Sequence, residues 1–158
     1  METMSSDDPH VKKNITDQGF WACQDAQIGG LVDSIVQTNY QFYADEGLGL
    51  FKAAVMQNRL VSDVIKALLP APTFVFCRAF GRTRYSHCIM NRTDDARTRI
   101  LTIFCWSTGS EGTLYSGSHA FRLAATAGPN GLLVVSNEAL HDHDGIVPHA
   151  IKMEHGGL

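Results

Sequence analysis

The sequence predicts an α+β fold in which helices in the first part of the chain pack on a curved antiparallel sheet. Apolar residues recur at helical spacing between residues 25 and 70, and the pattern ends at Pro70-Ala71-Pro72. Beyond these prolines, short apolar runs alternate with polar turns as far as residue 153. Helices first and consecutive strands afterwards are typical of α+β domains.

The helical part divides into two patterns. Asp25 can cap the start of the first helix, and Glu46-Gly47 can end it. The second pattern covers residues 50–69, with a break near Asn58 and a restart at Ser62. We therefore expect two helices of this part to lie across one face of the sheet.

Six segments beyond the prolines read as strands, separated by turns rich in Gly, Asn and Asp. In chain order they are 73–80, 84–91, 99–106, 113–118, 131–136 and 146–153. We expect the sheet to curl into a jelly roll, with a cone-shaped α+β barrel of the nuclear-transport-factor-2 (NTF2) type as the alternative. In both architectures the hollow of the sheet is the expected ligand site.

The 158 residues fit a single domain with one core. Within it we expect a loose segment at residues 1–24, a helical part at 25–70 and a β part at 73–158. Gly156-Gly157-Leu158 reads as the beginning of a further strand. Since a second copy of the chain would cover an edge left open there, we expect a homodimer.

Composition narrows the class of protein. Residues 73–123 carry seven arginines and three acids, but the net charge of the chain is −3 and no lysine lies between residues 67 and 151. A nucleic-acid partner is therefore not expected. No apolar run is long enough to span a bilayer and the chain begins without a secretory pattern, so we expect a cytoplasmic protein without a membrane partner. The four cysteines lack C-x-x-C spacing and are expected to be free thiols.

Four side chains are the candidate catalytic residues. Alternation along the second predicted strand places Tyr85 and His87 on one face, where an imidazole near neutrality can transfer protons. Arg78 and Arg99 lie within strand patterns, and a guanidinium there could hold an acidic or carbonyl-rich substrate. We expect these four residues to act on a bound small molecule.

Aromatic residues of the β part are core residues first and the expected pocket walls second. The candidate substrate-binding residues are Phe76, Phe104, Trp106, Tyr115 and His119.

The histidines His141, His143, His149 and His155 are the obvious metal candidates, but His141-Asp142-His143-Asp144-Gly145 reads as a polar turn. We predict solvated loop histidines there, with no metal and no cofactor.

The segment Tyr115-Ser116-Gly117-Ser118-His119, which follows the predicted strand 100–106, resembles the Pro-Gly-Ser-His segment of phytanoyl-CoA dioxygenase-like proteins. The likeness extends weakly over residues 73–158 and is closest to small members associated with fungal specialised metabolism. It implies a double-stranded β-helix. Catalytic members bind iron through His-x-Asp and a later histidine, with an arginine that holds 2-oxoglutarate. Here His87-Cys88-Ile89 lacks the aspartate, and His155-Gly156-Gly157 would stand at the later histidine.

A scaffold of this type without its metal still offers a cavity with fixed polar groups. The leading hypothesis is a cofactor-independent cyclase, isomerase or dehydratase acting on a hydrophobic intermediate of natural-product biosynthesis. One alternative is an Fe(II)/2-oxoglutarate oxygenase of unusual ligation, using His87, an acidic group and His149 or His155. The other is a non-catalytic protein that binds a small molecule or serves in assembly.

Overall fold

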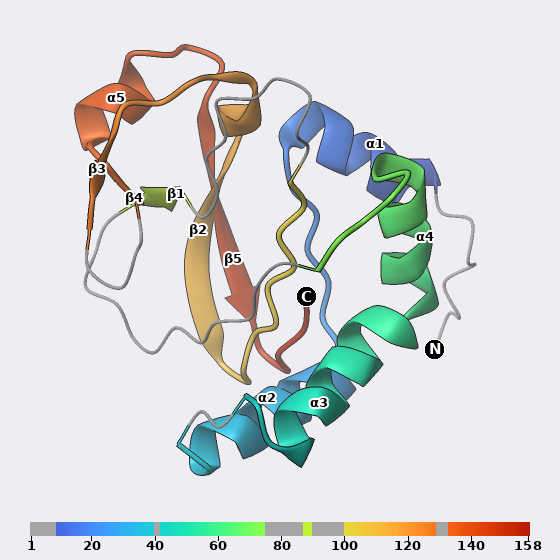
Figure 1. Cartoon of the computed structure of the whole chain (residues 1–158). Helices are drawn as coiled ribbons and strands as arrows, with labels where there is room; N and C mark the ends of the chain where they lie inside the picture. Colours follow the sequence, from blue (N-terminus) through green and yellow to red (C-terminus); the bar gives the residue numbers. More distant parts are fainter. Residues whose placement is uncertain (1–8, 40–41, 75–86, 90–99, 129–132) are drawn as a thin grey trace.

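The computed structural model describes residues 9–39, 42–74, 87–89, 100–128 and 133–158, and these form a mixed α+β molecule (Figure 1). Most helices gather on one side of a long two-stranded ribbon, and a small three-stranded sheet lies on the other side. The α+β prediction is confirmed, although the described strands do not close into a barrel. Within these ranges no helix has the length and apolar character needed to cross a membrane.

The chain is ordered earlier than predicted. Helix α1 (Pro9–Gln18) lies against helix α4 (Arg59–Leu68), and Val11 on α1 is only 1% exposed. Gly19 ends α1: its N–H donates to the Ile15 carbonyl at 3.0 Å, and its φ of +91° is a backbone conformation that glycine adopts without strain. The expectation of a loose segment at residues 1–24 is therefore wrong for residues 9–24.

Helix α2 (Ala26–Gln37) begins where the sequence predicts. The Asp25 carboxylate accepts hydrogen bonds from the backbone N–H groups of Gln27 and Ile28, at 3.0 and 3.1 Å. The predicted end at Glu46-Gly47 is wrong, because Asn39 adopts a left-handed conformation (φ +58°) that stops the helix.

Glu46 instead lies in the first turn of α3 (Asp45–Phe51), where the helix dipole stabilises a negative charge. Helix α3 continues into a π-helical turn, η1 (Lys52–Met56), and α4 follows. The break near Asn58 is confirmed, and the Asn58 side chain accepts the Val61 N–H at 3.1 Å. Asn58 is thus the cap in place of the predicted Ser62, which lies inside α4.

The helices bury a common apolar core. Residues from α2, α3, η1 and α4 meet there with the last residue of the sequence, and the buried members are Ile28, Ile35, Leu50, Ala54, Val61 and Leu158.

The ribbon consists of β2 (Ser110–Ser116) and β5 (Val147–Met153), paired antiparallel from Ser110 opposite Met153 to Ser116 opposite Val147. The second sheet has the order β1-β4-β3, with β1 (Cys88–Ile89), β4 (Leu133–Val135) and β3 (Ala125–Ala127). A second apolar cluster, formed by Leu123, Val135 and Leu140 with Tyr115 and Ile89 against it, joins this sheet to the ribbon.

Three predicted strands, 113–118, 131–136 and 146–153, correspond to β2, β4 and β5. The predicted strand 99–106 is wrong over residues 100–105, where the backbone is irregular, and Trp106 makes a single bridge to Gly157. Of segments 73–80 and 84–91, residues 75–80, 84–86 and 90–91 lie outside the described residues. Strand β3 and the short helix α5 (Asn137–His141) were not predicted.

The residues Gly156-Gly157-Leu158 are paired on both sides by the chain itself. Cys23 and Leu158 exchange two backbone hydrogen bonds (2.8 and 3.0 Å), as do Trp106 and Gly157 (2.8 and 3.1 Å). Asp25 N–H also donates to Gly156 O at 3.0 Å. The expectation of an open edge at this point is therefore wrong, and the homodimer that rested on it stays a prediction.

Glycines allow this close approach of the backbones. A Cβ built on Gly29 would lie 2.1 Å from His155 O, and one built on Gly156 would lie 2.3 Å from the Gly29 Cα. Both distances are shorter than the contacts that real Cβ atoms make in proteins. Helix α2 and residues 155–156 can therefore pack this closely only with glycine at both positions.

Replacing Gly29 by alanine should destabilise the fold, whereas the same change at its neighbour Gly30 should not. Gly30 has open space around it, and alanine there should add up to about 1 kcal/mol to the free energy of unfolding through helix propensity. At Gly29 the clash should cost about 1–3 kcal/mol. Urea unfolding measures both variants. Equal stabilities of Gly29→Ala and Gly30→Ala would contradict the contact.

Burial raises the pKa of the Cys23 thiol from 9.0 to about 11; the Asp25 charge adds to the rise and a backbone hydrogen bond to Leu158 opposes it. Between pH 9 and 11 the unfolded chain has lost this proton and the folded chain keeps it, so stability present below pH 9 should fall as pH rises. In Cys23→Ala this part of the fall should disappear. Chemical unfolding of both proteins across this range measures it, and identical slopes would refute it.

Candidate functional site

His87 and Tyr115 lie together where the three-stranded sheet meets the ribbon. The Tyr115 hydroxyl oxygen is 3.0 Å from His87 Nδ1, and the two rings meet edge to face with centroids 5.1 Å apart at 88°. Both side chains are partly buried. A phenol and an imidazole in direct hydrogen-bond contact can pass a proton between them.

Asn137, the first residue of α5, contacts the other ring nitrogen. Its Oδ1 lies 2.6 Å from His87 Nε2. Asn137, His87 and Tyr115 thus form one chain of hydrogen bonds, the Asn137–His87–Tyr115 chain. Sequence reasoning missed Asn137, although Ser136 ahead of Asn137-Glu138 is a typical helix-start signal that indicates α5.

Local structure fixes each member of this chain. The His87 carbonyl accepts the Val135 N–H at 3.0 Å, so β4 holds the backbone of His87. Strand β2 carries Tyr115, whose ring packs on the cluster of Leu123, Val135 and Leu140. The Ser136 hydroxyl caps α5 by accepting the Ala139 N–H at 3.2 Å. Three separate elements therefore position the three polar groups.

Two predicted pocket aromatics lie elsewhere. The rings of Phe104 and Trp106 are neighbours, with centroids 5.9 Å apart, and the Trp106 ring lies over Gly112 of β2. Because side chains alternate along a strand, the face of β2 at Gly112 is opposite to the face at Tyr115. The structure therefore separates Trp106 from the His87–Tyr115 pair and assigns it to packing.

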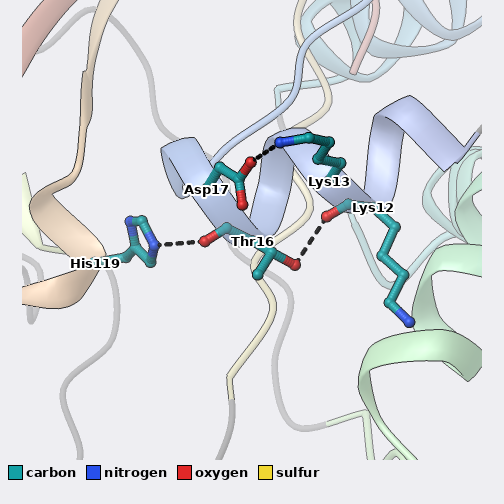
Figure 2. Close-up of polar contacts among 5 residues, drawn as sticks. All are labelled: Lys12, Lys13, Thr16, Asp17 and His119. Carbon is teal, nitrogen blue, oxygen red and sulfur yellow. Dashed lines mark hydrogen bonds and ion pairs between the residues drawn. The ribbon is translucent and has the colours of Figure 1, made fainter.

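His119 has a structural contact. Its Nε2–H donates to the carbonyl oxygen of Thr16 near the end of α1, at 3.0 Å, as Figure 2 shows. A Cβ built on Gly19 would lie 2.3 Å from His119 Nδ1, so the imidazole fills the space that this glycine leaves. The described contacts of His119 thus tie α1 to the segment after β2, and its predicted place beside a substrate finds no support there.

Replacing His119 by alanine should loosen α1. One hydrogen bond of about 1 kcal/mol is lost, so the α1 amides should exchange with deuterium about fivefold faster. Nuclear magnetic resonance of the exchanging amides measures this. The matched control is Thr16→Ala, which keeps the Thr16 carbonyl and removes only the hydroxyl bond to Lys12 O. Unchanged exchange in His119→Ala would contradict the tie.

The remaining predicted site residues, Phe76, Arg78, Tyr85 and Arg99, lie outside the described residues.

Among the described residues, two surface depressions on the ribbon are the best defined. The larger, of about 490 Å³, is lined by Glu111, Gly112, Thr113, Ala150, Ile151 and Lys152. The smaller, of about 200 Å³, lies between β5 and residues 22–24. Neither depression is lined by His87 or Tyr115. These depressions are therefore not the predicted cavity inside a curved sheet.

Three of the described histidines in the last part of the sequence have separate neighbours. His141 Nδ1–H donates to the Asn137 carbonyl (2.7 Å), the His143 ring stacks on Phe121 with centroids 4.3 Å apart, and His149 contacts the Ser116 hydroxyl (2.9 Å). In the part of the chain that the structure describes, no three His, Cys, Asp or Glu side chains converge as metal ligands would.

Comparison of the chain with protein-family models, curated proteins and solved structures gives no match.

Proposed function

We propose that this protein is a cofactor-independent isomerase or cyclase that moves a proton on a hydrophobic small molecule of natural-product biosynthesis. The observation that carries the proposal is the 3.0 Å contact between the Tyr115 hydroxyl and His87 Nδ1. Such a pair can take a proton from carbon beside a carbonyl and return it at another carbon. The reaction leaves the number of protons and electrons on the substrate unchanged.

The surroundings of the pair support an apolar substrate. Tyr115 packs against Leu123, Val135 and Leu140, and Ile146 and Ala125 lie at the edge of the same cluster. An apolar setting strengthens the hydrogen bonds of the polar groups within it. A carbonyl-containing hydrocarbon skeleton fits this combination better than a charged, strongly hydrated metabolite does.

The remaining expectations belong to this proposal. A jelly-roll sheet of the phytanoyl-CoA dioxygenase-like type, or the NTF2-type barrel, would extend the two small sheets around the pair. In the oxygenase alternative His87 would have to release either Tyr115 or Asn137 to bind iron, because each of its ring nitrogens has a partner here. The isomerase proposal needs no such rearrangement.

An isomerisation assay tests the proposal. The probe is 4-pentylcyclohex-3-enone, and the rise in ultraviolet absorbance follows its conversion to the conjugated ketone. Tyr115→Phe, which keeps the ring and removes the hydroxyl, should lower kcat/KM by about 100-fold or more, as should His87→Ala. Circular dichroism and thermal unfolding check that both variants fold.

His155→Gln is the matched control. Its side chain is exposed and only its backbone N–H has a described bond, to Gln24 Oε1. This variant should keep the wild-type rate. Wild-type protein that converts no more ketone than buffer does, or Tyr115→Phe and His87→Ala at the wild-type rate, would overturn the proposal and favour a non-catalytic binding or assembly role.

A further inference from the structure

We infer that Asn137 is a positioning residue: it holds His87 in the tautomer that carries its proton on Nε2, and so directs the Tyr115 proton towards Nδ1. The hydrogen-bond chemistry of the Asn137–His87–Tyr115 chain carries this inference. The proton-transfer role of Asn137 rests on the proposed function, but the tautomer it selects does not.

The first step concerns the contact at Nε2. Asn137 places its side-chain oxygen, 2.6 Å away, against this nitrogen. An amide oxygen only accepts hydrogen bonds, so His87 Nε2 has to carry the proton. In a neutral imidazole the other nitrogen is then an acceptor.

The second step concerns the contact at Nδ1. Since Nδ1 carries no proton, the Tyr115 hydroxyl has to donate its own hydrogen across the 3.0 Å contact. The lone pairs of the Tyr115 oxygen are left to accept a proton from a bound molecule while its own proton moves to Nδ1. When the proton returns to the substrate, the Tyr115 hydroxyl and the neutral His87 are restored.

The third step concerns why Asn137 keeps its position. It is the first residue of α5, whose start is capped by the Ser136 hydroxyl and whose last residue, His141, donates to the Asn137 carbonyl at 2.7 Å. Leu140 anchors the same helix in the apolar cluster. Contacts at the start and at the end of this short helix therefore fix Asn137, as expected for an element that orients a catalytic histidine.

The tautomer can be read without any substrate. The experiment uses the full chain labelled with ¹⁵N in histidine, and long-range ¹H–¹⁵N correlation spectra above the pH at which histidines titrate. Wild-type His87 should show a protonated Nε2 and an unprotonated Nδ1. In Asn137→Ala the signals should shift towards a mixture of both tautomers, and Asn137→Asp, which restores an oxygen acceptor, should recover the Nε2–H form.

Two controls accompany these spectra. Glu138→Gln changes the neighbouring exposed side chain and should leave His87 unchanged. His141 reports on folding, because it contacts the main chain of Asn137 and should keep its tautomer in every variant. A wild-type His87 with its proton on Nδ1, or an unchanged tautomer in Asn137→Ala, would overturn the inference. If wild-type protein shows no isomerase activity while His87 has the expected tautomers, this result would count against the proposed function alone.

Discussion

The pairing of residues 156–158 with two distant segments is the contact on which the rest of the structure depends. Gly157 bridges Gln24 on one side and Trp106 on the other, and Leu158 enters the core of the helices. Backbone hydrogen bonds within a buried setting are costly to leave unpaired, so each segment requires the others. The absence of side chains at Gly29 and Gly156 lets the helix and this segment approach closely enough for the bonds to form.

The ribbon of β2 and β5 connects this contact with the candidate site. Strand β5 leads from the apolar cluster near Tyr115 directly into residues 156–158, and β2 begins just after Trp106. One end of the ribbon is thus fixed to the helical core, and the other end carries Tyr115 against His87. The Thr108 N–H bond to Asp33 Oδ1 (3.2 Å) adds a second tie between α2 and the start of β2. A displaced ribbon would move Tyr115 relative to a histidine that β4 holds independently.

Local signals in the sequence predicted the parts that local chemistry decides. Asp25 predicted a helix start because a carboxylate satisfies free N–H groups within three residues. His87 was a candidate from its place in a strand pattern; its contact with Tyr115 comes from the structure, and its catalytic role stays a prediction. The path of Trp106 and the place of residues 156–158 depend on pairing across more than fifty residues, which no local pattern contains. Asn137 was missed for a related reason: its role comes from a residue fifty positions away, although the cap at Ser136 indicated its helix.

Native-state hydrogen exchange at the amides of Cys23, Trp106 and Gly157 tests most directly whether this pairing holds the helices and the ribbon together. All three amides donate to partners on another segment. If the pairing holds the fold together, these amides should exchange only through global unfolding, so that their opening free energies equal the free energy of unfolding. The denaturant dependence of their exchange should match that of the most protected core amides. Exchange of Gly157 and Trp106 by local opening, well below that free energy, would show that the helices and the ribbon are held together by other contacts.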